Sequence, residues 1–218
     1  MKINLRAKAY NVLKNKIILF QLKPGDKIFE QDIAESLKTS RTPVREALLM
    51  LESEGLVTNH ERLGYIVRKL SAREVEEYLS LRETLELFAA PMIIKSITPP
   101  ELSSLEDNLR RAAECVGQKN LSVIVTCENE FHDILYNSVR SGIFCETISH
   151  LVDKYRWLRA ISLKAPGAAQ DSINGHKAMF KAIKKRDVSA LKKLIHLHIL
   201  EAKRRALEQG WFVLDESE

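Results

Sequence analysis

The sequence predicts a mainly α-helical protein of two domains, with a small three-helix module and a hairpin over residues 1–70 and an all-helical bundle over residues 71–218. Apolar residues recur at helical spacing along most of the chain. Two short strand patterns occur, and both precede residue 70. With only 8 Gly and 6 Pro among 218 residues, the composition is that of an ordered helical protein.

The excess positive charge is confined to the first third of the chain. Residues 1–70 contain 13 Lys and Arg against 8 Asp and Glu, whereas residues 71–218 contain 21 of each. A basic module beside a neutral one is typical of a protein that binds a polyanion and has a second task. No apolar run approaches the ~18 residues of a membrane span. The three cysteines lack CxxC spacing, which indicates free thiols in a reducing cytoplasm.

Apolar spacing and end signals define three helices in the first module. The first helix carries an apolar stripe over residues 5–17, and the second spans about residues 30–37. For the third helix we expect Thr42 as the N-cap and Pro43 at the first helical position, where its missing N–H costs nothing. Gly55 fits the left-handed residue that ends this helix.

Two short strands follow the third helix. They are expected at residues 56–58 and 65–68, with a turn at residues 60–64 between them. Three helices followed by a two-stranded hairpin make a winged helix-turn-helix, whose third helix enters the major groove of DNA.

The start of the third helix is unusual because Arg41 and Arg45 lie where the helix dipole disfavours positive charge. Phosphates or guanine edges of double-stranded DNA would stabilise both arginines there. Ser40 and Thr42, with the free N–H groups of the first turn, can bind phosphate, and Gly64 lets the wing backbone approach the minor groove. The alternative is a solvated basic helix in a small accessory domain.

The bundle begins at Ser71, because Ser71 and Glu74 have the spacing of a capping box. The first helix of the bundle is expected to run to about Ile97, with a kink or interruption at Pro91. No strand pattern appears after residue 70. The remaining helices are expected at about residues 101–117, 121–139, 143–163, 173–185 and 188–209.

Four polar residues interrupt the inward faces of three of these helices. Glu128 and His132 lie one turn apart among apolar residues, and His176 and His198 each share a face with apolar neighbours. Three histidines and one carboxylate are enough for a divalent-metal site. No thiolate takes part, so nitrogen and oxygen donors set the choice of ion. Zinc is the expected ion, with nickel or manganese as alternatives. The four residues could instead be satisfied core residues.

The segments SLKTSRTPVREALLMLESEGLV and ERLGYIVRKLSAREVEEYLSLRETLE resemble the GntR family of bacterial transcriptional regulators. The helical remainder resembles the FCD-type ligand domain of the FadR subfamily. Relatives can have Arg where this chain has Gln31. The resemblance implies operator DNA contacts at Gln31, Ser40, Arg41, Thr42, Arg45 and Gly64.

The resemblance also implies a metal-assisted site for a small organic acid effector. Many FCD-type domains have Asp four residues before the first metal-binding His, and Glu128 is a departure from that pattern. Arg82 matches an arginine that often faces the cavity, although a surface salt bridge with Glu86 is an alternative. The remaining residues that could line the pocket are Tyr78, Arg156, Trp157 and Arg159.

These patterns together predict a cytoplasmic, nucleoid-associated transcription factor that binds a palindromic operator as a homodimer, since one recognition helix reads only a few base pairs. Residues 71–218 would then serve effector binding and dimerisation. We therefore do not expect an enzyme. Two alternatives are a metalloenzyme with an accessory DNA-binding domain and a structural DNA-binding protein whose histidines belong to the core.

Overall fold

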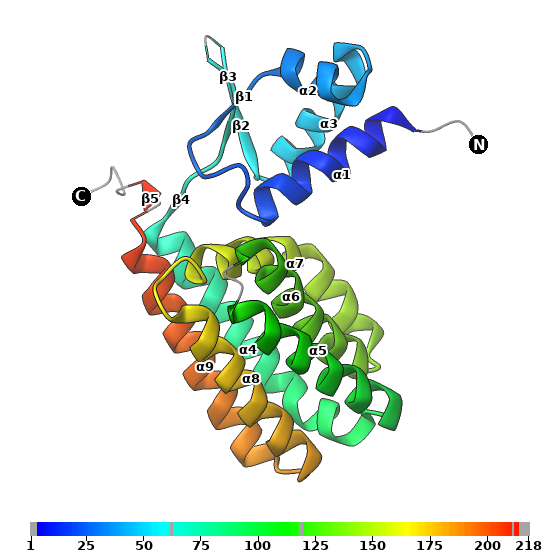
Figure 1. Ribbon diagram of the computed structural model, residues 1–218, viewed down its shortest axis with the longest axis vertical. Helices are drawn as coiled ribbons and strands as arrows, with labels where there is room; N and C mark the ends of the chain where they lie inside the picture. Colours follow the sequence, from blue (N-terminus) through cyan, green and yellow to red (C-terminus); the bar gives the residue numbers. More distant parts are fainter. Residues whose placement is uncertain (1–3, 62, 118–119, 211, 214–218) are drawn as a thin grey trace. The chain divides into compact units, whose positions relative to one another are not determined.

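The computed structural model of the protein describes residues 4–61, 63–117, 120–210 and 212–213. The described chain divides into two compact units, one of residues 4–70 together with residues 212–213 and one of residues 71–210 (Figure 1). We call them the N-terminal unit and the C-terminal unit.

The N-terminal unit combines three helices with a small antiparallel sheet. Its helices pack through apolar faces, with Leu13 and Ile17 of the first helix and Leu48 and Leu51 of the third fully buried. The elements are α1 (Leu5–Ile18), β1 (Lys27–Ile28), α2 (Glu30–Leu37), α3 (Arg41–Ser53), β2 (Val57–His60) and β3 (Gly64–Val67). The sheet has the order β1-β3-β2, and His60 pairs with Gly64 at the end of the hairpin. This arrangement confirms the predicted winged helix-turn-helix.

Three details of the N-terminal unit differ from the prediction. Strand β1 was not expected, because two residues are too short to show an alternating pattern. The N-cap of α3 is Ser40 rather than Thr42. Pro43 therefore lies in the first turn but not at its first position, and it is tolerated because the first N–H groups of a helix have no intrahelical partner. The predicted turn includes Arg62, which lies outside the described residues.

The C-terminal unit is built from helices α4 to α9. The capping box is present, since the N–H of Glu74 donates to the Ser71 hydroxyl and the N–H of Ser71 donates to the Glu74 carboxylate. The helices are α4 (Ala72–Ser96), α5 (Pro99–Gly117), α6 (Leu121–Ser138), α7 (Gly142–Ser162), α8 (Ala168–Lys184) and α9 (Val188–Glu208). Together they confirm a mainly helical fold with a helical bundle.

Some element bounds in the C-terminal unit also need correction. Helix α4 continues through Pro91, whose ring is exposed. Helix α8 begins at Ala168, about one turn before its expected start, because its first turn is built from small residues that carry no apolar period. Two short strands outside the helical bundle were also missed, β4 (Leu70–Ser71) and β5 (Phe212–Val213), which pair with each other. Strand β5 groups with the N-terminal unit.

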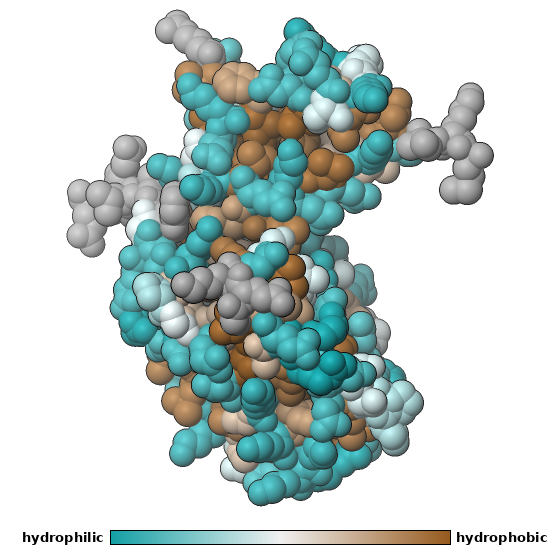
Figure 2. All heavy atoms as spheres, in the orientation of Figure 1, coloured by the Kyte–Doolittle hydropathy of each residue, from teal (hydrophilic) through white to brown (hydrophobic). Residues whose placement is uncertain are grey.

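Within the C-terminal unit, α4 packs along α9 and α5 along α6, while α8 contacts both α5 and α9. Its core includes the fully buried Phe131, Tyr155 and Trp157. Figure 2 shows that hydrophilic side chains cover most of the presented face of both units, with apolar side chains in smaller patches. Among the described residues, no helix combines the length and the apolar character that crossing a bilayer requires.

Candidate functional site

The N-terminal end of α3 presents both predicted arginines. Ser40, Arg41, Thr42 and Arg45 are exposed, and Arg45 keeps 63% of its side-chain surface open to solvent. Within the described residues, the Ser40 side chain makes no capping bond to the first turn of α3. These residues form the basic surface that the sequence predicted for DNA.

Two side chains of α2 hold these arginines. Arg45 donates from Nε and from Nη2 to the two carboxylate oxygens of Glu30, both at 2.9 Å. Arg41 donates from Nε to the side-chain oxygen of Gln31 at 2.5 Å. Gln31 in turn donates from its amide nitrogen to Glu35.

The wing is open at its glycine. Gly64 has a φ of +74°, and a Cβ placed on it would meet nothing within 4 Å. Glycine is used here because the left-handed conformation is costly for other residues, and the free space leaves the backbone accessible.

In the C-terminal unit, three helices bring three histidines together. His132 of α6, His176 of α8 and His198 of α9 offer ring nitrogens that all lie within 4.8 Å of one another. The ring centroids of His176 and His198 are 4.7 Å apart, and those of His132 and His176 are 5.0 Å apart. Phe131 stacks on His176 at 3.9 Å. The predicted convergence of the three helices is therefore present.

Glu128 lies beside this cluster without belonging to it. Its Oε1 is 3.5 Å from Nδ1 of His176, and its Oε2 accepts a hydrogen bond of 2.7 Å from the Ser172 hydroxyl. Both Oε1 of Glu128 and Nε2 of His176 are buried without a hydrogen-bond partner among the described residues. Such orphaned atoms are rare in protein interiors, where each costs desolvation energy.

Burial sets the protonation of these groups. It lowers the pKa of His132 and His176 well below the ordinary value, and lowers the pKa of His198 to about 3. Burial raises the pKa of Glu128 to about 7, although the Ser172 hydroxyl opposes this change. The histidines are thus neutral at pH 7, which is the form that binds metals.

These residues fit a divalent metal ion. Neutral imidazoles and a carboxylate are suitable ligands for zinc, and the orphaned oxygen and nitrogen atoms would gain a partner. Ligand atoms about 2.1 Å from a tetrahedral ion lie roughly 3.4 Å from one another. The ring nitrogens, which lie within 4.8 Å of one another, would therefore have to approach by up to about 1.4 Å.

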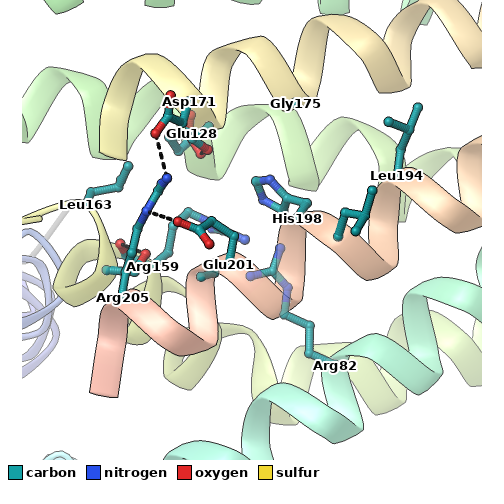
Figure 3. Close-up of a pocket in the computed structure, with 14 residues that line it drawn as sticks. Arg82, Glu128, Arg159, Leu163, Asp171, Gly175, Leu194, His198, Glu201 and Arg205 are labelled. Atoms are coloured by element: carbon teal, nitrogen blue, oxygen red, sulfur yellow. Dashed lines mark hydrogen bonds and ion pairs between the residues drawn. The ribbon is translucent and has the colours of Figure 1, made fainter. Parts of the chain in front are cut away.

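A cavity of about 200 Å³ opens beside the cluster. In Figure 3 the side chains of Arg82, Arg159 and His198 point into it from different helices. Arg82 is buried and donates from Nε to Glu86 at 2.7 Å, so the pair with Glu86 exists but does not lie on the surface. Nη2 of Arg82 also lies 3.1 Å from Nε2 of His132. Arg82 therefore connects the cavity wall to the histidine cluster.

Among the described residues, Arg159 is the arginine of this cavity that makes no ion pair with a carboxylate. Its side chain donates to the amide oxygen of Asn129, and its buried Nε has no partner among the described residues. Burial, together with the charge of Arg82, lowers its pKa to about 10. An anionic ligand would relieve this uncompensated charge.

Arg205 also lines the cavity, and it was not identified from the sequence. It donates to Asp171 at 2.7 Å and lies 2.8 Å from Glu201, and Figure 3 shows both contacts. Arg205 lies two turns after His198 on the same face of α9, which is the signal that could have identified it.

Three residues predicted for the pocket lie elsewhere. Arg156 pairs with Asp133 at 2.6 Å, Trp157 is fully buried with Lys154 over its ring, and Tyr78 is not among the residues that line the cavity. Trp157 directly follows Arg156 and therefore faces another side of α7, whereas Arg156 and Arg159, three positions apart, share a side of the helix. Helical spacing alone could not show that Asp133 holds Arg156 away from the cavity.

A winged helix-turn-helix with an exposed basic recognition helix, joined to a helical unit with an internal cavity, defines a DNA-binding transcriptional regulator. A family model for the FCD domain matches residues 77–201, and a model for bacterial regulatory proteins of the gntR family matches residues 5–67. The chain belongs to the GntR family of transcriptional regulators, in the FadR-like subfamily with a C-terminal FCD domain.

Similar proteins agree with this assignment. The chain is 29% identical to the uncharacterized HTH-type transcriptional regulator YdhC of Bacillus subtilis (strain 168), over 92% of each chain. It is 26% identical to the HTH-type transcriptional repressor RspR of Escherichia coli (strain K12), over 88% of this chain and 84% of the relative. The structure of E. coli McbR/YncC matches the fold with a TM-score of 0.82 and 24% identity, covering 95% of this chain and 99% of that one. These relatives are transcriptional regulators, not enzymes, so the metalloenzyme alternative is discarded.

Proposed function

We propose that the protein is a metabolite-responsive regulator of the cytoplasm, which binds a palindromic operator as a homodimer and senses a small organic acid at a metal-assisted site. The observation that carries the proposal is the cavity, where Arg159 has no carboxylate partner among the described residues and lies beside a cluster of three neutral histidines. An anion is the ligand that this charge distribution favours.

The proposed metal ligands are Glu128, His132, His176 and His198. The orphaned atoms of Glu128 and His176 support this set, and the imidazole and carboxylate donors favour zinc, with nickel or manganese as alternatives. A bound divalent ion would supply positive charge for a carboxylate oxygen of the effector. In the other reading of the cluster, the histidines are core residues and the protein binds no metal.

The effector would interact with Arg82 and Arg159. A guanidinium binds a carboxylate through two parallel hydrogen bonds, and these two arginines approach the cavity from α4 and α7. A volume of about 200 Å³ suits a small hydroxy or sugar acid. Tyr78, Arg156 and Trp157 have no part in this site.

The DNA surface would comprise Ser40, Arg41, Thr42, Arg45 and Gly64. Because helix α4 carries Arg82 and begins directly after β4, effector binding could change how two recognition helices are spaced in a dimer. An effector changes that spacing only through different affinities for the two arrangements. The coupling is reciprocal, so operator DNA must change effector affinity by the same factor.

Two measurements test this proposal. Metal analysis of the purified protein should find about one divalent ion per chain, and the double variant His132→Ala/His176→Ala should lose it while keeping DNA binding. Full occupancy in the double variant would place the ligands elsewhere, and no metal in the wild type would favour the core-histidine reading.

The second measurement is calorimetry of small organic acids with the zinc-loaded protein, with and without operator DNA. The expected acid binds the wild type, binds Arg159→Gln at least tenfold more weakly, and changes its affinity when operator is present. Lys154→Gln is a matched control, since it removes a cation of α7 that does not line the cavity. Equal effector affinity with and without operator would refute the link between effector and DNA.

A further inference from the structure

Helix α2 holds both arginines of the recognition helix through the same edge of each guanidinium. Glu30 accepts from Nε and Nη2 of Arg45, and Gln31 accepts from Nε of Arg41. In both cases the acceptor lies at the first turn of α2 and the guanidinium extends beyond it. The two contacts therefore have the same form: an acceptor in the first turn of α2 holds the guanidinium of an arginine of α3.

Among the described residues, the side chain of Arg45 is hydrogen-bonded only to Glu30, which leaves the outer edge of its guanidinium free. A guanidinium has five N–H groups, and Glu30 takes the pair formed by Nε and one hydrogen of Nη2. The other pair, formed by Nη1 and the second hydrogen of Nη2, remains available. Arginine reads guanine by donating two parallel hydrogen bonds to O6 and N7, and this outer pair is suited to that contact.

Exposure distinguishes the two partners of this ion pair. Glu30 keeps only 19% of its side-chain surface exposed, whereas Arg45 keeps 63%. The carboxylate is therefore fixed by its surroundings while the guanidinium faces solvent. A carboxylate beside a DNA-binding surface opposes phosphate binding, so its place there calls for a compensating role.

A favourable interaction with the dipole of α2 does not explain why Glu30 lies beside the DNA-binding surface. Asp32 also lies in the first turn of α2 and interacts with the same dipole, but among the described residues it makes no hydrogen bond to an arginine of α3. Glu30 differs from Asp32 in its two bonds to Arg45.

We propose that Glu30 is a positioning residue for sequence specificity: it orients the free edge of Arg45 toward a base and thereby increases discrimination rather than overall affinity. Gln31 orients Arg41 in the same way. Both ends of the Gln31 amide are engaged within the protein, by Arg41 and by Glu35. This assignment replaces the direct DNA contact expected at Gln31.

The proposal rests on DNA reading by α3, so the experiment begins by selecting a binding sequence from random duplexes with the full-length wild-type protein. Dissociation constants are then measured for the selected duplex and for a shuffled duplex at one salt concentration. Their ratio is the readout. Far-UV circular dichroism verifies that each variant is folded.

Glu30→Gln should lower this specificity ratio about tenfold. Its affinity for the shuffled duplex should stay equal or rise, because a negative charge is lost. Asp32→Asn removes the same charge from the same turn, so it should change both affinities equally and leave the ratio unchanged. An unchanged ratio in Glu30→Gln would overturn the proposal.

A double-variant cycle separates positioning from a structural effect. If Glu30 acts through Arg45, then Glu30→Gln should change the ratio less than twofold once Arg45→Ala is present. A full tenfold effect in that background would overturn the proposal. Failure of the wild type to enrich any sequence would overturn both DNA reading by α3 and the role of Glu30, whereas the other two outcomes concern Glu30 alone.

Discussion

Acidification should destabilise the metal-free C-terminal unit through its buried histidines. The folded-state pKa values of His132, His176 and His198 are lowered below the ordinary value of 6.5. Such groups contribute stability that is present above their unfolded pKa and is lost as the pH falls. Glu128 acts in the opposite direction, because its folded pKa is raised from 4.5 to about 7. Its contribution is present below pH 4.5 and is lost as the pH rises through about 7.

The magnitude follows from proton counting. Between pH 6.5 and 4.5 each neutral histidine changes the free energy of unfolding by about 1.4 kcal/mol per pH unit. His132 and His176 give about 2.7 kcal/mol per unit, and Glu128 subtracts about 1.4. His198 is half-buried, so its contribution to the slope lies between zero and about 1.4 kcal/mol per pH unit. The net loss over these two pH units is roughly 3–5 kcal/mol, which is a large share of the stability of a typical domain.

Urea unfolding of the chelator-treated protein, followed by far-UV circular dichroism at several pH values, measures this slope. His176→Asn should reduce the slope by about 1.4 kcal/mol per pH unit, and Glu128→Gln should increase it by the same amount. His196→Asn is the matched control, since His196 is exposed on the same helix as His198. A free energy of unfolding that stays constant from pH 6.5 to 5, or equal slopes in all variants, would refute the reasoning.

Four further predictions concern single features of the two units. Zinc at about 100 times its dissociation constant should raise the free energy of unfolding of the wild type by roughly 2.7 kcal/mol, measured by thermal denaturation. The same zinc concentration should not change the stability of His132→Ala/His176→Ala. Arg45→Ala should weaken binding to the selected duplex about tenfold or more in fluorescence anisotropy, and equal weakening on shuffled DNA would show a phosphate contact instead. Ser71→Ala removes the capping box of α4 and should cost about 1 kcal/mol in urea unfolding, whereas Ser80→Ala on the exposed face of the same helix should cost much less. Gly64→Val should lower the stability of the N-terminal unit by about 1–2 kcal/mol, because φ is +74° there; an unaffected melting temperature would show that the wing tolerates the strain.

The fold could be predicted from the sequence where local signals and apolar spacing agreed. The capping box at Ser71, the glycine after α3 and the apolar stripes of α4 to α9 each correspond to observed elements. Strands β1, β4 and β5 could not be predicted, because two residues carry no periodicity. The N-cap of α3 was wrong by two residues, since Ser40 and Thr42 are both good capping residues and only the tertiary structure selects one.

The candidate site was predicted less completely. Helical spacing was enough to bring His132, His176 and His198 together, because each shares a face with buried apolar residues. Spacing could not show whether Arg82 and Glu86 pair in the core or on the surface, since the i, i+4 separation is the same in both. Arg205 was missed although it lies two turns after His198 on α9, because the contact with Asp171 of α8 that holds it joins two helices and leaves no local pattern.

The histidine cluster also has a consequence for how the chain folds. Its three members come from α6, α8 and α9, so the cluster exists only after the last helix has docked. A divalent ion held there would link distant parts of the chain and restrict the unfolded ensemble, as a disulfide does. Unlike a disulfide, this cross-link would be removed by a chelator, so protection of α9 from proteolysis would depend on the supply of metal.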